Sequence, residues 1–249
     1  MAASSVDLSV IVPAYNEADR LPETLRRFQQ YLSSKSCSYE ILAVLDGPTD
    51  RTRQILTGMA SEIEHLKILD RAVNRGKGFT VKEGMLAAIG RIRLFSDADN
   101  STDISHFDKM IPLFKEGYDI VIASRHSKDA AGAQQAVSQA RYKRIIGQVG
   151  NRIIQSVAVP GIWDTQCGFK AFRDYAAEKI FSVGVIEGWG FDIETLALAR
   201  ALHYKIGIVP AYWINKPGRH VGIFSYAQVL LDTVRLPRGL SRSEYKLSK

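Results

Sequence analysis

The sequence predicts an α/β fold built on a mostly parallel sheet with helices on both faces. Short apolar runs of strand length recur along the 249 residues, and each is closed by a proline, a glycine turn or a polar cluster. Between them, apolar residues recur every three or four positions, which is the spacing of amphipathic helices. Strands that alternate with helices in this way usually pair in parallel. The composition, 46% hydrophobic and 24% charged, is enough for one sizeable core.

The first half of the chain alternates regularly between the two patterns. Residues 8–12 form an apolar run closed by Pro13, which suits a buried parallel strand. The next helix is predicted from apolar residues at helical steps, namely Leu21, Leu25, Phe28 and Leu32. The later elements are, in order, a strand over 40–45 ended by an Asp-Gly-Pro turn, a helix from about Asp50, a short strand over 67–69, a helix over 79–89, a strand over 92–95 and a helix over 106–114.

The second half continues this alternation with one interruption. Residues 119–123 form another apolar strand, whereas residues 128–139 are rich in Ala, Gln and Gly, show no apolar stripe and are predicted to be a mobile loop. Apolar residues repeat every four positions from Ile145 to Val157, which predicts a helix, and a helix over 193–202 and a strand over 206–209 follow. No repeat or linker divides the chain, so we expect one domain over residues 1–222.

The remaining residues, 223–249, are predicted to form a C-terminal amphipathic helix and tail. Apolar residues gather between positions 224 and 236, with Arg235 and Arg238 nearby. This stripe has two interpretations: it packs on the domain, or it lies at a membrane surface. Packing is the ordinary role of such a stripe, and the sequence leaves both open.

The charge of the chain limits its partners. The formal net charge is +7, which favours anionic ligands such as nucleotides, phosphates, nucleic acid or acidic lipid headgroups. The two cysteines, Cys37 and Cys167, form no disulfide framework, and the five histidines lack zinc-ligand spacing. The N-terminus has no signal-peptide pattern, and no apolar run of about 18 residues occurs. No aromatic and basic stripe of a strand-binding surface is present, so we expect no nucleic-acid partner.

Polar clusters follow the predicted strands, at the edge of the sheet where ligands bind in such folds. They occupy residues 13–17, 46–50, 96–103 and 124–125. In the third cluster, Asp97 and Asp99 are two residues apart, so in an extended chain both carboxylates point the same way. A hard cation such as Mg²⁺ or Mn²⁺ would relieve their repulsion, with substrate phosphates completing its coordination. The other interpretation is a polar turn that caps the next helix.

Longer motifs decide between these interpretations. The stretches VIVPAYNEADRLPETL, LDGPTDRT, RGKG and SDADNS resemble the glycosyltransferase family 2, whose members have the GT-A fold. WDTQCGFK and GWGFDIE are similar to its polyprenyl-phosphate branch, and most of all to the dolichyl-phosphate β-glucosyltransferases. The resemblance covers roughly residues 8–221. It implies an inverting, metal-dependent enzyme that moves a sugar, expected to be glucose, from a UDP-sugar to a polyprenyl phosphate.

The resemblance also implies which residues form the site. Asp99, Asp164 and Arg125 are expected to be catalytic, and Asp97 and Asp99 to hold Mg²⁺ or Mn²⁺. The expected donor-binding residues are Pro13, Ala14, Tyr15, Glu17, Asp46, Lys77, Asp97, Ala98, Asp99, Trp189 and Asp192. A tryptophan in a glycine-rich turn is more often part of a core, so Trp189 has that second interpretation. Cys167 is expected to be a small packing residue.

The acceptor needs cationic support, because a lipid phosphate is already ionised and needs no base. The expected acceptor-binding residues are Arg125, Arg141, Lys143, Arg144 and Arg219, and arginine forks suit phosphate oxygens. The basic run around position 143 has a second interpretation as a solvated helix face. Asp164 either acts at the sugar or orients these arginines.

One departure from the family pattern bears on the donor. The family usually carries two adjacent aspartates before the glycine and then a serine, whereas this chain has Leu45 before Asp46, and Pro48 in place of the serine. This departure leaves the donor base and sugar open. The alternatives are GDP-mannose as the donor, a saccharide as the acceptor, or a phosphate- or nucleic-acid-binding module without catalysis, which would also explain the positive charge. The enzyme is expected on the cytoplasmic face of a membrane, bound peripherally.

Overall fold

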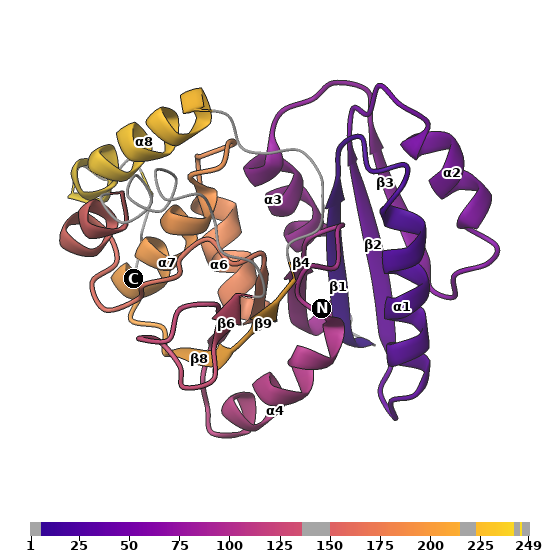
Figure 1. The fold of residues 1–249 in the computed structure, drawn as a ribbon, viewed down its shortest axis with the longest axis horizontal. Helices are drawn as coiled ribbons and strands as arrows, with labels where there is room; N and C mark the ends of the chain where they lie inside the picture. Colours follow the sequence, from indigo (N-terminus) through magenta and orange to yellow (C-terminus); the bar gives the residue numbers. More distant parts are fainter. Residues whose placement is uncertain (1–5, 136–149, 215–222, 242–244, 246–249) are drawn as a thin grey trace.

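The computed structural model describes residues 6–135, 150–214, 223–241 and 245. Its centre is a seven-stranded sheet in the order β3-β2-β1-β4-β7-β5-β8 (Figure 1). The strands are β1 (Val6–Ala14), β2 (Tyr39–Asp46), β3 (Leu66–Arg71), β4 (Gly90–Ser96), β5 (Ile120–Ser124), β7 (Phe169–Arg173) and β8 (Ile206–Pro210). A separate ribbon pairs β6 (Gln134–Gln135) with β9 (Tyr212–Trp213).

The predicted α/β class is confirmed, because most strand pairs are parallel. β1 pairs in parallel with β2 and β4, β2 with β3, and β5 with β8. Only β7, among the described strands of this sheet, is antiparallel to its neighbours β4 and β5. The two parallel groups of strands are therefore separated by one reversed strand.

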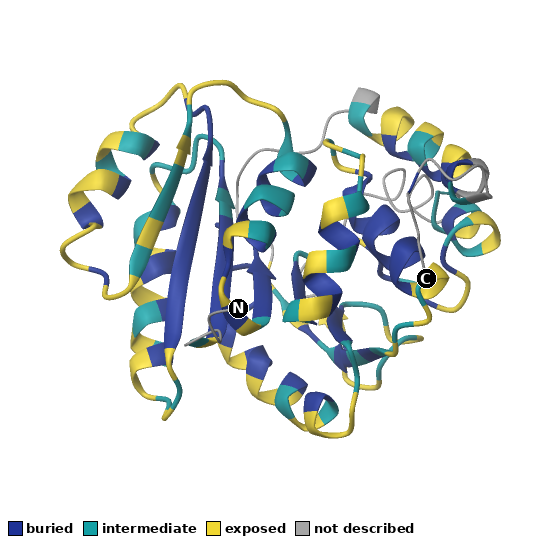
Figure 2. Ribbon diagram, turned by 180° about the vertical axis from the view of Figure 1, so that it is seen from behind, coloured by how far each residue is buried: buried dark blue, intermediate teal, exposed yellow. Residues whose placement is uncertain are grey.

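Helices cover both faces of the sheet and bury a separate core on each (Figures 1 and 2). The described helices include α1 (Leu21–Ser33), α2 (Thr52–Met59), α3 (Lys77–Ala87), α4 (Phe107–Lys115), α6 (Asp174–Val183), α7 (Phe191–Ala201) and α8 (Ile223–Ser241). On one face the core contains residues of α1, α2 and α4. On the other it contains residues of α3, α6, α7 and α8.

Apolar spacing explains why these elements form where the sequence predicted them. In α1, Pro22 occupies the first turn and Leu21, Leu25, Phe28 and Leu32 are all buried. Every residue of β2 is buried, including Leu45, so the departure from the family pattern continues the strand into the core. A carboxylate at position 45 would therefore face apolar side chains.

The sequence missed several elements. It gave no strand over β7, no helix over α6 and no strand over β9. In β7, the buried Lys170 breaks the apolar run that would have marked a strand. Residues 128–139 were predicted to be a loop, yet β6 lies within them; residues 136–139 are outside the described part of the chain.

The C-terminal helix α8 packs one face on the domain. Val229, Thr233 and Leu236 are buried, while Tyr226, Leu231 and Val234 are largely exposed. The division at residue 222 stays a prediction. Residues 150–157 are helical, and the start of the predicted helix, at 145–149, lies outside the described residues. No described helix combines the length and the apolar character needed to cross a bilayer.

Candidate functional site

Four of the predicted polar clusters meet where strands β1, β2, β4 and β5 end. Pro13 and Ala14 close β1, Asp46 closes β2, and Asp97 and Arg125 directly follow β4 and β5. In open α/β sheets this edge is where ligands bind. Four predicted acceptor residues lie outside the described part of the chain: Arg141, Lys143, Arg144 and Arg219.

Lys77 contacts the first carboxylate of the acidic motif. Its Nζ lies 2.7 Å from Oδ1 of Asp97 and 5.0 Å from the ring centre of Trp189. Burial alone would lower the pKa of Lys77, but the charges of Asp97 and Asp192 outweigh it and raise the pKa. Lys77 therefore stays protonated beside Asp97. Trp189 is 42% exposed, so its interpretation as a core residue is wrong.

The second carboxylate of the motif is held by the chain turn. Asp99 accepts a hydrogen bond from the backbone N–H of Ser101 (2.9 Å) through Oδ1, which leaves Oδ2 able to bind a cation. Ala98 is buried, and its carbonyl accepts a bond from the Thr24 hydroxyl (2.7 Å), which anchors the motif to α1. The side chain of Asp97 is 34% exposed.

These two carboxylates fit a divalent cation that shares its coordination with a ligand. They are hard oxygen donors, which suits Mg²⁺ or Mn²⁺. Within the described ranges, no group of three or more His, Cys, Asp and Glu side chains gathers in a way that could hold a metal ion. A metal at this site would therefore complete its coordination with oxygens of a substrate or of water.

The turn after β1 is tied to the turn after β2. Asn16 has a positive φ of 55° and exchanges hydrogen bonds with Thr49, whose backbone N–H donates to Oδ1 at 2.7 Å. Glu17 accepts a two-bond fork from Arg20, at 2.6 and 2.7 Å. Burial raises the pKa of Glu17, with smaller contributions from Asp99 and Asp97. Tyr15 is half-buried.

The carboxylate of Asp46 is bound by other residues of the protein. Its carboxylate accepts backbone N–H groups of Arg75 (2.8 Å) and Gly76 (2.9 Å) and an ion pair from Arg71. The side chain is only 5% exposed. Asp46 therefore holds the loop that leads into Lys77.

Arg125 and Asp164 form a buried fork at the other side of the site. The guanidinium donates Nε–H and Nη2–H to Asp164, each at 2.7 Å, and the Arg125 backbone N–H adds a third bond of 2.7 Å. Burial would raise the pKa of Asp164, but the charge of Arg125 outweighs it and lowers the pKa. The ring of Trp213 lies 5.5 Å from the guanidinium carbon. Three of the five Arg125 N–H groups remain for a ligand.

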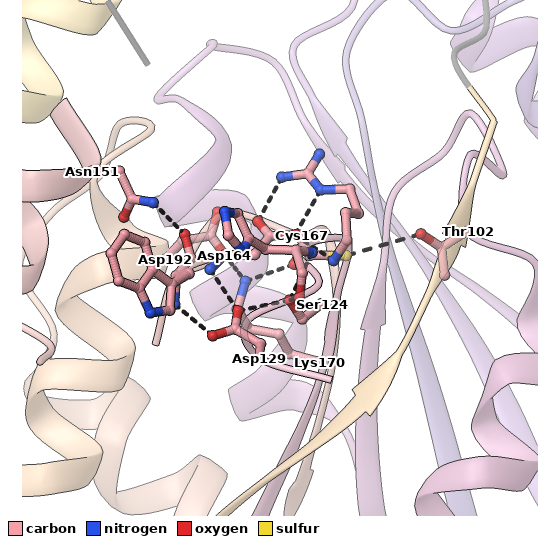
Figure 3. Close-up of polar contacts among 11 residues, drawn as sticks. Thr102, Ser124, Asp129, Asn151, Asp164, Cys167, Lys170 and Asp192 are labelled. Carbon is pink, nitrogen blue, oxygen red and sulfur yellow. Dashed lines mark hydrogen bonds and ion pairs between the residues drawn. The ribbon is translucent and has the colours of Figure 1, made fainter. Parts of the chain in front are cut away.

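Asp129 supports this fork, and the sequence did not indicate it. Its carboxylate accepts the backbone N–H groups of Trp163 and Asp164, both at 2.8 Å, and the hydroxyl of Ser124 at 2.7 Å (Figure 3). It thereby ties the end of β5 to the segment that carries Asp164. Asp129 lies in the segment that the sequence predicted to be a mobile loop, so no pattern pointed to it.

Lys170 is a second buried residue that the sequence did not assign. It is 1% exposed, donates to the Cys167 carbonyl (2.7 Å) and forms an ion pair with Asp192 (Figure 3). Burial raises the pKa of Asp192 although Lys170 and Lys77 oppose this. Positive and negative side chains therefore alternate through this part of the molecule, in the order Lys170, Asp192, Lys77 and Asp97. The GFK sequence is part of the motif that resembles the family, but nothing in it indicated that the lysine is buried.

The neighbouring residues have structural partners. Glu194 accepts the backbone N–H groups of Val185 (2.9 Å) and Ile186 and the hydroxyl of Tyr245 (2.8 Å). Cys167 is fully buried, and burial raises its pKa to about 11, which agrees with a packing role and not with a nucleophile.

The chain is similar to sugar-transferring proteins. The model of the family described as Glycosyl transferase family 2 matches residues 9–181. A dolichyl-phosphate β-glucosyltransferase of Dictyostelium discoideum is 37% identical over 246 residues, which cover 93% of this chain and 74% of the relative. One of Drosophila melanogaster is 36% identical, over 86% of this chain and 69% of the relative.

A solved structure has the same fold at low sequence identity. Glucosyl-3-phosphoglycerate synthase of Mycobacterium tuberculosis, crystallised with Mn²⁺, UDP and glucosyl-3-phosphoglycerate, aligns with a TM-score of 0.67 at 17% identity. The alignment covers 100% of this chain and 83% of that chain. At this identity the likeness supports the architecture and not the ligands.

Proposed function

Because the chain belongs to glycosyltransferase family 2, we propose that it transfers glucose from a UDP-sugar to a dolichyl-type phosphate with inversion. The relatives named dolichyl-phosphate β-glucosyltransferase support the sugar and the acceptor. The donor nucleotide is taken from the sequence resemblance.

One observation of the structure carries the proposal: two differently charged groups lie at one sheet edge, one strand apart. Asp97 and Asp99 follow β4, Arg125 follows β5, and only β7 separates these strands. Strand spacing puts the two groups roughly 10 Å apart. The charge of Asp97 also acts on Arg125. A diphosphate on the acidic side and an acceptor phosphate on the arginine side would then be neighbours.

The residues have distinct roles in the transfer. Lys77 binds the donor diphosphate, and Trp189 packs on the sugar. Arg125 binds the acceptor phosphate with the N–H groups that Asp164 does not use, and Asp164 orients it. The phosphate oxygen attacks the anomeric carbon while the bond to the diphosphate breaks. Mg²⁺ or Mn²⁺ held by Asp99 and Asp97 would offset the charge on the departing diphosphate.

The protein is proposed to bind peripherally to the cytoplasmic face of a membrane, because its acceptor is a lipid. The exposed residues Tyr226, Leu231 and Val234 of α8 provide an apolar contact. The test is flotation with liposomes. Leu231→Glu with Val234→Glu should release the protein, and Val185→Glu, at a 57% exposed apolar position outside α8, is the control.

A donor screen tests the enzymatic proposal. UDP-glucose, UDP-N-acetylglucosamine and GDP-mannose are each incubated with a short dolichyl phosphate, with Mn²⁺, with Mg²⁺ and with chelator. We expect glucosyl lipid only from UDP-glucose and only with a metal. Mannosyl lipid from GDP-mannose would overturn the donor, and transfer to a free sugar would overturn the acceptor.

A further inference from the structure

We propose that Gly168 is a positioning residue for Asp97, and that this is the reason for the glycine in the DTQCGFK motif. The inference rests on the proposed donor site. Gly168 precedes β7, the reversed strand between the donor and acceptor groups. It therefore stands directly beside the acidic motif, although 71 positions separate it from Asp97.

The pairing of β4 with β7 puts Gly168 opposite Asp97. Ser96 pairs with Phe169, and the ladder continues for one more step, because the Asp97 N–H donates to the Gly168 carbonyl at 3.1 Å. Directly opposite residues of an antiparallel pair carry their side chains on the same face. Phe95 and Lys170, paired two residues earlier, share this face. The side chain of Asp97 and a side chain at position 168 would therefore compete for one space.

The carboxylate of Asp97 occupies that space. A Cβ built on Gly168 would overlap both carboxylate oxygens, with Oδ1, the farther of the two, at 2.7 Å. Cβ atoms in proteins essentially never approach a non-bonded heavy atom within 3.0 Å. The three nearest atoms to such a Cβ all belong to Asp97. Any larger residue would push this carboxylate off β7.

Backbone freedom does not explain the glycine. Gly168 is not among the glycines with positive φ, so its conformation is open to other residues. The missing side chain is the property that the site uses. It lets Asp97 lie over β7, where Oδ1 reaches Nζ of Lys77 at 2.7 Å. Gly168 thus leaves room for the carboxylate on one side, and Lys77 forms an ion pair with it on the other.

A double-mutant cycle tests the contact. Thermal unfolding midpoints are compared for the wild type, Gly168→Ala, Asp97→Ala and the double variant. We expect Gly168→Ala to lower the midpoint by roughly 3–10 °C in the wild type. In the Asp97→Ala protein the same change should have little effect, because the overlapping carboxylate is gone. An equal loss in both backgrounds would overturn the proposal.

Binding tests the consequence for the donor site. Calorimetric titration with UDP and Mn²⁺ should show affinity reduced by roughly 10- to 100-fold in Gly168→Ala, since disturbing the groups that position a metal ligand typically costs about this much metal affinity. Gly58→Ala, in α2 with no atom within 4 Å of the added Cβ, is the matched control and should bind as the wild type does. Unchanged affinity in Gly168→Ala would overturn the positioning role. If the wild type itself bound no UDP, the donor assignment would fail, while the unfolding cycle would still decide the contact.

Discussion

Replacing Arg125 separates the acceptor from the donor. Arg125→Ala removes the guanidinium that, in the proposed mechanism, binds the lipid phosphate. A hydrogen bond to a charged group contributes about 1.5–3 kcal/mol, so acceptor affinity should fall roughly 10- to 150-fold. UDP affinity should hardly change, because β7 separates Arg125 from the strand that leads to Asp97 and Asp99.

The structure also sets the cost to stability. Asp164 is 8% exposed, and the substitution leaves its carboxylate with one backbone donor, the N–H of residue 125, and without the ion pair to a guanidinium. Removing one partner of a buried pair costs about 3–5 kcal/mol, and the 21% exposure of the arginine places this case toward the lower end. Unfolding in urea measures this loss separately, so binding is compared only at temperatures where the variant is folded.

Arg125→Lys gives a finer test of the geometry. An ammonium keeps the charge but cannot form the two-bond fork with Asp164 and still direct planar N–H groups at a phosphate. We expect partial recovery of acceptor affinity. Arg26→Ala is the control, because Arg26 forms the same kind of fork with Glu62 on the surface.

The assay is a pair of titrations, with UDP plus Mn²⁺ and with a short dolichyl phosphate, on the wild type and each variant. Loss of UDP affinity with intact lipid-phosphate affinity would refute the acceptor role of Arg125. Equal losses for both ligands would show that the fork supports the whole site and does not belong to the acceptor alone.

Three other changes have defined outcomes. Asp99→Ala should lower transfer roughly 100-fold or more at any Mn²⁺ concentration, because the metal supplies several kcal/mol; Asp108→Ala, on α4, is its control, and full activity in excess chelator would contradict the metal role. Lys170→Met should cost about 3–5 kcal/mol in urea unfolding by leaving Asp192 buried without its cation. Lys170→Met with Asp192→Asn should recover most of that loss, and a double variant no more stable than the single one would be evidence against the pair. His106 accepts the Tyr212 N–H through Nε2 (3.0 Å), and burial lowers its pKa. The folded protein therefore favours neutral His106, and this stabilisation is complete above the unfolded pKa of about 6.5. It is lost as the pH falls from there toward the lower pKa of the folded state. His106→Gln should flatten that part of the profile of unfolding midpoint against pH, and an unchanged slope would exclude His106 as its source.

The sequence predicted the strands well because most of them are buried on both faces. The ends of the strand and the ends of the apolar run that predicted it differ by at most two residues for β1, β2, β4, β5 and β8. Continuous apolar runs are the signal of such strands. β7 gave no such signal, because Lys170 is buried by pairing with Asp192, 22 positions away. A hydrophobicity pattern cannot distinguish a paired buried lysine from a solvated one.

The site was predictable where its residues follow a strand and unpredictable where they meet across the fold. Asp97, Asp99 and Arg125 follow strands, so the topology alone placed them at one edge. The fork between Arg125 and Asp164 joins residues 39 positions apart. The support from Asp129 depends on hydrogen bonds to backbone N–H groups, which no residue pattern encodes. The exposure of Trp189 depends on how the turn before α7 sits against Lys77.

The charges of the described residues around the site give a physical reason to expect a metal together with the donor. The network consists of the cations Lys77, Arg125 and Lys170 and the carboxylates Asp97, Asp99, Asp129, Asp164 and Asp192. Counting these described residues alone, five carboxylates against three cations leave two formal negative charges, although the whole chain carries +7. A sugar diphosphate is itself doubly negative, so it would be repelled by this network. One divalent cation at Asp97 and Asp99 would cancel the excess, after which Lys77 can attract the phosphate oxygens of the donor.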